Sequence, residues 1–175
     1  NGLHAKRRRN RRKRNVPHHH HPDHHERSTK LARELNLPML MSLDTHTRLS
    51  RILPGYFDDI EIQFLKEGDV VTKWLGQPVV VYEVPGHDEG QLALASQDMS
   101  WFIAGDLFQG VGTVVIGDDE GDMAKYFATL EKVILLNPKV VFPSHGIGLG
   151  GVGILERTLE HRRTREQQIL IHYQD

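Results

Sequence analysis

The 175-residue sequence contains no cysteine, which excludes a disulfide framework and any metal site built from thiolates. A metal ion bound by this chain would need imidazole and carboxylate ligands, and twelve histidines are available. Long apolar runs are also lacking: no stretch reaches the roughly 18 apolar residues that a membrane span requires, and no secretory signal is recognisable. We therefore expect a cytoplasmic protein that does not contact membranes.

Acidic residues are missing from the first 15 positions, whereas eight lysines and arginines lie between residues 6 and 14. Taking these eight from the 22 basic residues of the chain leaves 14, against 23 acidic ones, so the remaining 160 residues have a net charge of −9. This balance argues against a nucleic-acid-binding body. We predict a disordered basic arm at 1–15 and one domain at 16–175, with residues 6–14 able to contact nucleic acid phosphates without sequence selectivity.

Helical and β patterns alternate after the arm. We expect a helix from Pro22 to about Asn36, a buried strand at 38–42 and a weaker helix at 45–53. A meander of short strands is expected next, at 60–65, 70–75, 79–84, 91–95 and 101–104. A helix near 123–134, a strand at 140–142 and a charged helix at 154–171 follow. Strands interleaved with helices indicate a mixed α/β fold built in layers.

Residues 19–24 read H-x-H-x-D-H. In an extended segment, side chains two positions apart point the same way, so His19 and His21 can hold one cation. Asp23 and His24, where the chain turns into a helix, are then placed to hold a second cation nearby. The alternative is an affinity tag, but a tag does not normally continue into Pro-Asp-His-His and an amphipathic helix.

Three further motifs each place one histidine or aspartate directly after an apolar β segment. These motifs are Pro85-Gly86-His87, Ala104-Gly105-Asp106 and Pro143-Ser144-His145-Gly146. A single polar residue at a strand end is most often simply solvated. Three of them in order after an H-x-H-x-D-H instead indicate a shared site on a rigid scaffold.

This ordered set resembles the metallo-β-lactamase superfamily from about residue 16 to the C-terminus. The resemblance implies a four-layered αββα sandwich with a dinuclear metal site at the edge between its two sheets. Carried over by position, it implies one metal held by His19, His21 and His87, a second held by Asp23, His24 and His145, and Asp106 as the bridge. It also implies that Asp23 is catalytic and orients a hydroxide. Zinc suits such ligands best, with manganese or iron as alternatives.

Two departures from the family pattern carry expectations of their own. Several dozen residues of strands normally precede the first motif, whereas 18 residues precede it here, so we expect an N-terminally incomplete sandwich and homodimerisation that covers it. Asp88 and Glu89 stand where a glycine-rich turn is usual, which predicts an acidic rim that repels polyanions. Ser144 and the loop 146–151 are candidates to border the substrate. The alternative for the loop is a flexible connector.

The leading functional prediction is a dinuclear metal-dependent hydrolase that uses a metal-bound hydroxide on a small-molecule ester, thioester or related carboxyl derivative. A phosphodiesterase or ribonuclease is the first alternative. Residues 161–170 fit H-R-x-x-R-E-x-Q-I-L, similar to a branch of glyoxalase-like and β-lactamase-like proteins of which some cleave RNA. A catalytically inactive metal-binding fragment and a basic-arm interaction module also stay open. An oxygen-reducing di-iron role is disfavoured, because di-iron proteins of this family are expected to have a carboxylate at the position of His21.

Overall fold

Two β-sheets form the centre of the computed structural model, which describes residues 14–110, 112–117 and 119–172. Six strands form the large sheet of this described part, in the order β3 (Val70–Trp74), β4 (Gln77–Glu83), β5 (Leu92–Ser96), β6 (Phe102–Gly105), β7 (Val140–Pro143) and β8 (Leu149–Gly150). The small sheet pairs β1 (Met39–Met41) with β2 (Ile62–Phe64) in parallel. The helices are α1 (Pro22–His25), α2 (Ser28–Leu35), α3 (Leu43–Ile52), α4 (Met123–Leu136) and α5 (Gly153–His172).

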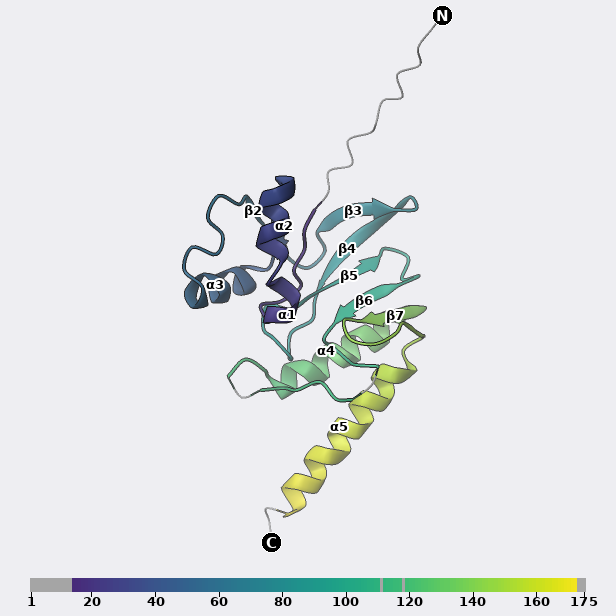
Figure 1. The fold of residues 1–175 in the computed structure, drawn as a ribbon. Helices are drawn as coiled ribbons and strands as arrows, with labels where there is room; N and C mark the ends of the chain where they lie inside the picture. Colours follow the sequence, from purple (N-terminus) through teal and green to yellow (C-terminus); the bar gives the residue numbers. More distant parts are fainter. Residues whose placement is uncertain (1–13, 111, 118, 173–175) are drawn as a thin grey trace, which may run out of the picture.

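Helices α2 and α3 lie on one side of the two sheets and α4 lies on the other, while α5 extends away from the sheets toward the C-terminus (Figure 1). On one side, Tyr126 and Leu130 of α4 pack with Phe102 and Val141 of the large sheet, and Leu155 of α5 joins the same core. This packing buries the apolar face of α4, and it makes the large sheet the inner neighbour of α4 and α5.

Strand β1 connects the two sheets because its side chains alternate. Leu40 packs with Val81 and Leu92 of the large sheet, whereas Met39 and Met41 pack with Ala32 of α2. The order from outside to outside is therefore α4 and α5, large sheet, small sheet, α2. The expectation of a mixed α/β fold with αββα layers is confirmed.

Most predicted elements are present, with three differences. The first predicted helix is divided into α1 and α2 by a turn at 26–27. The strand predicted at 60–65 exists as β2 but does not belong to the meander, because it pairs with β1. The loop 146–151 contains β8, which pairs antiparallel with β7, so the prediction of a flexible connector is wrong for Leu149 and Gly150. Alternation of side chains identifies a strand but not its partner, and two residues are too few to alternate.

The predicted basic arm lies almost entirely outside the described residues, which begin at Arg14. In the described ranges, no helix combines the length and the apolarity that crossing a membrane requires.

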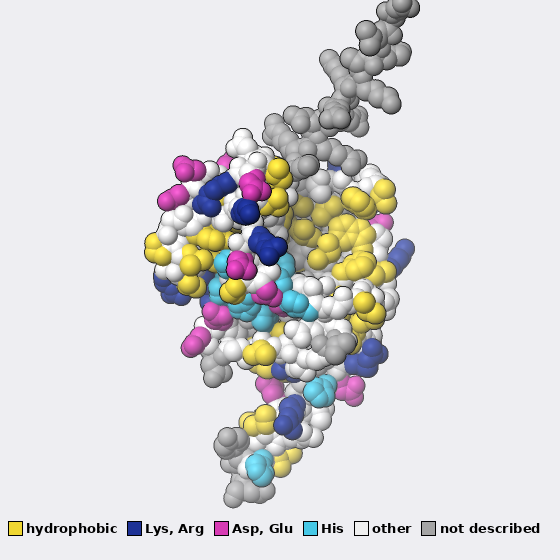
Figure 2. All heavy atoms as spheres, in the orientation of Figure 1, with side chains coloured by type: hydrophobic (Ala, Val, Ile, Leu, Met, Phe, Trp, Pro, Cys, Tyr) yellow, Lys and Arg dark blue, Asp and Glu magenta, His cyan; other side chains and the backbone are white. Residues whose placement is uncertain are grey.

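Strand β3 forms one edge of the large sheet, and its Val70 and Trp74 side chains are more than half exposed. Hydrophobic side chains gather over β3 and β4 in Figure 2.

Candidate metal centre

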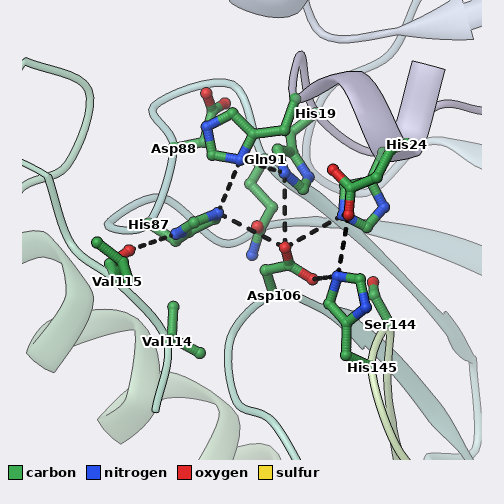
Figure 3. Close-up of polar contacts among 12 residues, drawn as sticks. His19, His24, His87, Asp88, Gln91, Asp106, Val114, Val115, Ser144 and His145 are labelled. Carbon is green, nitrogen blue, oxygen red and sulfur yellow. Dashed lines mark hydrogen bonds and ion pairs between the residues drawn. The ribbon is translucent and has the colours of Figure 1, made fainter. Parts of the chain in front are cut away.

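All seven residues predicted as metal ligands converge on one place in the structure. His19 and His21 lie in the segment that enters α1, and Asp23 and His24 lie in α1 itself. The others follow the ends of β4, β6 and β7, and they are His87, Asp106 and His145. Figure 2 shows histidine side chains gathered on one face below α1, and Figure 3 shows five of these side chains turned toward one another.

Three imidazoles and one carboxylate form the first donor group, which consists of His19, His21, His87 and Asp106. His21 Nδ1 lies 3.0 Å from His19 Nε2 and 3.1 Å from His87 Nε2. Asp106 Oδ2 lies 3.7 Å from His19 Nε2 and 3.6 Å from His87 Nε2. Four ligands at about 2.0–2.1 Å from a tetrahedral cation stand about 3.3–3.4 Å apart, so this group has the size of a zinc site.

The second donor group consists of Asp23, His24 and His145, with Asp106 again in reach. Asp23 Oδ2 lies 3.1 Å from His24 Nε2 and 3.2 Å from His145 Nε2. Asp106 Oδ2 lies 3.2 Å from His24 Nε2, and Asp106 Oδ1 lies 3.7 Å from His145 Nε2. A single carboxylate thus faces both groups, as a bridge between two cations would.

Hydrogen bonds on the far side of two rings determine where their lone pairs point. His87 Nδ1 donates to the carbonyl of Val115 at 2.7 Å, so a neutral His87 has a lone pair on Nε2. His21 Nε2 donates to Glu120 Oε2 at 3.0 Å, so a neutral His21 has its lone pair on Nδ1. These two lone pairs face each other across 3.1 Å, an arrangement that is repulsive without a cation between them.

His19 has an outer partner of its own in His18. Their Nδ1 atoms are 2.8 Å apart, and His18 Nε2 lies 3.1 Å from Ser144 Oγ. Burial lowers the pKa of His18 to about 4 and lowers the pKa of His19 further, so both rings are neutral at pH 7. If Ser144 accepts from His18 Nε2, the shared proton belongs to His19 Nδ1, and the His19 lone pair at Nε2 joins the first donor group.

The charge state of the centre also fits a cation. Burial acts to raise the pKa of Asp106, but the 3.2 Å contact with His24, together with the charges of His87 and His145, lowers it to about 2. His24 Nε2 and Asp106 Oδ1 are buried and have no hydrogen-bond partner among the described residues. Unpaired buried groups are costly, and a cation held by the second donor group would offer a partner to these atoms.

Exposure differs between the two groups. His19 is fully buried, whereas the side chains of Asp23 and His145 are 58% and 47% exposed. The first donor group therefore lies inside the protein, and the second opens to solvent. A substrate would approach from the side of Asp23 and His145.

The sequence prediction missed His20, Glu120 and the role of Asp88. His20 is buried, with Nδ1 against Asp88 Oδ2 and Nε2 3.0 Å from Glu120 Oε1. The hydrogen bond with Asp88 is the largest of the effects that raise the pKa of His20. Alternation places His20 opposite the metal-facing side chains, and no local pattern indicates a partner 100 residues away.

The predicted acidic rim is wrong for Asp88. Asp88 is fully buried, and its Oδ1 atom accepts a hydrogen bond from the Gly90 backbone at 2.8 Å. Glu89 forms an ion pair with Lys125 at 2.7 Å, which neutralises its charge. The turn after His87 thus directs one carboxylate inward, where it holds His20.

The motif at residues 161–170 contacts the loop that carries Val114 and Val115, next to the candidate centre. Arg162 of α5 contacts the carbonyl of Val114, and its guanidinium lies 5.7 Å from the centre of the Tyr126 ring. Val114 precedes Val115, whose carbonyl accepts from His87. Arg162 therefore holds the loop that orients a predicted ligand, a structural task that the sequence pattern alone did not indicate.

The chain is similar to several known proteins. The family model described as "Metallo-beta-lactamase superfamily" matches residues 11–145. The Beta-lactamase-like protein 2 homolog of Drosophila melanogaster is 36% identical over 120 residues, which is 68% of this chain and 39% of that protein. The hydroxyacylglutathione hydrolase of Bdellovibrio bacteriovorus is 33% identical over 81 residues, which is 45% of this chain and 30% of that protein.

Among solved structures, a beta-lactamase domain protein from Burkholderia ambifaria has a TM-score of 0.75 and 23% identity, with 90% of this chain and 57% of that chain covered. This likeness shows the fold. The chain spans about 30–40% of the length of the two curated relatives named above.

Proposed function

The chain belongs to the metallo-beta-lactamase superfamily, and from this premise we propose that it is a hydrolase that binds two divalent metal ions. Superfamily members are generally hydrolases. The proposal rests on one observation: His21 Nδ1 lies within 3.1 Å of both His19 Nε2 and His87 Nε2, while the Asp106 carboxylate faces both donor groups. Imidazole and carboxylate donors favour zinc, with manganese and iron as alternatives.

His19, His21 and His87 would hold the first metal ion, Asp23, His24 and His145 the second, and Asp106 both. The metal ions would supply an activated water nucleophile at neutral pH and polarise the bond that is hydrolysed.

The chain's own residues position the reactants. The exposed Asp23 carboxylate lies at the open side of the centre, where it can orient the attacking water and then pass a proton to the leaving group. Asp106 is ionised at neutral pH, because its pKa is about 2. The buried His19 and His87 and the partly buried His21 form the inner wall, so that substrate meets the centre from the solvent side.

We propose a small-molecule ester, thioester or related carboxyl derivative as the substrate. Two observations support this class: the similarity to a hydroxyacylglutathione hydrolase, and the net charge of −9 over residues 16–175, which disfavours polyanions. The second candidate is a phosphodiesterase or ribonuclease, favoured by the basic residues 6–14 and by the motif at 161–170. A catalytically inactive metal-binding fragment is the third.

The test begins with metal content. Chelator-washed and zinc-reconstituted protein should contain close to two metal ions per chain, and the His87→Ala and Asp106→Ala variants clearly fewer. A thioester and a labelled RNA would then be offered to the same preparation. Parent protein without tightly bound metal, or variants that bind metal like the parent, would contradict the proposal. Metal binding without turnover of either substrate would support the inactive fragment.

Cytoplasmic location and homodimerisation remain proposals. The exposed Val70 and Trp74 on the edge strand β3 are the residues that a second copy could cover. Elution from a sizing column as a monomer at all concentrations would contradict dimerisation.

A further inference from the structure

The candidate centre is connected to the loop between β6 and α4 through Glu120, a carboxylate that belongs to neither donor group. Glu120 Oε2 accepts a hydrogen bond from His21 Nε2 at 3.0 Å, and Oε1 accepts one from His20 Nε2 at 3.0 Å. His21 and Glu120 are 99 residues apart in the sequence. The carboxylate therefore joins two distant segments directly beside the first donor group.

The hydrogen bond with Glu120 determines which nitrogen of His21 is free to bind a metal ion. A neutral imidazole has one N–H and one lone pair, so holding the proton on Nε2 leaves Nδ1 free to bind a cation. The hydrogen bond also fixes the plane of the ring, and a carboxylate partner makes a metal-binding imidazole more basic. His21 Nδ1 is the atom that lies within 3.1 Å of both His19 Nε2 and His87 Nε2, so its placement determines the shape of the first group.

Glu120 is itself held in place. Its side chain is 38% exposed, so packing alone does not fix it. His20 stands between Glu120 and the fully buried Asp88, and Asp88 accepts from the Gly90 backbone at 2.8 Å. Asp88, His20, Glu120 and His21 thus form one continuous chain of polar contacts that ends at the centre.

We propose that Glu120 is a positioning residue that fixes His21 through its Nε2 atom and thereby sets the metal affinity of the first donor group but not of the second. The inference rests on the proposed metal-binding function. A merely structural role of Glu120 would give a different result. Loss of a structural contact in the loop would lower the metal affinity of both donor groups together, or lower the stability of the protein without affecting one group more than the other.

Single-site backgrounds separate the two groups. His145→Ala removes a donor from the second group and leaves the first complete, whereas His87→Ala does the reverse. Zinc affinity would be measured by competition with a chromophoric chelator, with and without Glu120→Ala in each background. We expect Glu120→Ala to weaken zinc binding by about 10-fold to 100-fold in the His145→Ala background. In the His87→Ala background, Glu120→Ala should change the zinc affinity by less than about 3-fold.

Matched variants control for charge and size. Asp119→Asn removes one negative charge from the neighbouring, exposed position of the same loop and should leave zinc affinity within about 2-fold of its background. Glu120→Gln keeps the size of the side chain but can accept through one oxygen only. Its zinc affinity should therefore lie between those of the parent and of Glu120→Ala. If Glu120→Ala does not fold, Glu120→Gln serves for both measurements.

The tautomer of His21 gives a second readout that needs no metal. Long-range ¹H–¹⁵N spectra of chelator-treated protein should show the His21 proton on Nε2 in the parent. In Glu120→Ala they should show a mixture of the Nε2–H and Nδ1–H tautomers. Equal zinc affinities in the His145→Ala background, or an unchanged His21 tautomer, would overturn the inference while the metal site stands. A parent that binds no zinc would overturn the proposed function instead, and the tautomer would still decide the role of Glu120.

Discussion

Gly86 lies so close to Tyr126 that a Cβ atom added to Gly86 would stand 2.3 Å from Tyr126 Cα and 2.5 Å from Tyr126 N. Gly86 also has a φ of +131°, a conformation that side chains rarely adopt, and its carbonyl accepts from Asp122 N at 2.9 Å. The first turn of α4 is thereby packed against the residue that precedes His87. The position of a predicted metal ligand thus depends on a residue without a side chain.

We predict that Gly86→Ala lowers the free energy of unfolding by about 2–4 kcal/mol, because the new Cβ meets backbone that cannot move aside and the φ value becomes strained. Chemical denaturation of metal-free protein would measure the loss. Gly117→Ala is the matched control, since an added Cβ there meets nothing within 4 Å. It should change stability by no more than about 1 kcal/mol. Equal effects of the two substitutions would contradict the close-packing argument.

The seven ligands could be predicted from the sequence because the order of the motifs resembles the metallo-β-lactamase superfamily, and the strand ends carry part of the same information locally. His19 and His21 alternate in an extended segment, and His87, Asp106 and His145 each follow an apolar strand. The mixed α/β class could be predicted because each element shows its own periodicity, whereas the αββα order of the layers was implied by the resemblance to the family.

The rest of the centre could not be predicted, because it depends on contacts between distant segments. Glu120 lies in a loop without periodicity, and the role of the Val115 carbonyl does not depend on its side chain. Asp88 follows His87 like a solvated turn residue, yet the structure buries it against His20. The partner of β2 was missed on the same ground, because alternation does not specify which strand lies alongside.

Tyr126 gives a prediction at alkaline pH. Its side chain is fully buried, its hydroxyl donates to the Leu107 carbonyl at 2.7 Å, and burial raises the pKa of Tyr126 to about 12. An unfolded tyrosine has a pKa of about 10, so the folded state holds the proton longer. The stabilisation is complete below pH 10 and is lost as the pH rises from 10 toward 12, at up to about 1.4 kcal/mol per pH unit.

Urea unfolding at several pH values between 8 and 11 would measure this slope, with Tyr126→Phe as the comparison because other groups also titrate. At pH 8 the variant should be less stable by about 1 kcal/mol, since it loses one buried hydrogen bond. Above pH 10 its stability should fall less steeply than that of the parent. Parallel curves would mean that Tyr126 does not titrate differently in the folded state.

Ser42 joins the start of α3 to the turn after His87. Its hydroxyl accepts from Thr45 N at 3.1 Å as the helix cap and donates to the Gly90 carbonyl at 2.7 Å. We predict that Ser42→Ala lowers the unfolding free energy by about 2 kcal/mol, because it removes a cap and the shorter of two hydroxyl hydrogen bonds to the buried Gly90 carbonyl, which keeps only the one from Thr45 Oγ1 at 3.3 Å. Asp122→Ala removes only the exposed cap of α4 and should cost about 1 kcal/mol in the same denaturation experiment. A larger loss for Asp122→Ala would contradict this ranking.

Removal of metal should lower stability, because the lone pairs of His21 and His87 then face each other at 3.1 Å without a cation. A ligand that binds the folded state stabilises it by about 2.7 kcal/mol when its free concentration is 100 times its Kd. Thermal unfolding with buffered zinc should therefore occur at a higher temperature than with a chelator. His87→Ala should shrink this difference, whereas His46→Ala should preserve it, because His46 lies in α3 and stacks on Phe57. If the parent unfolds at the same temperature with zinc and with chelator, the donor groups do not bind zinc in the folded chain.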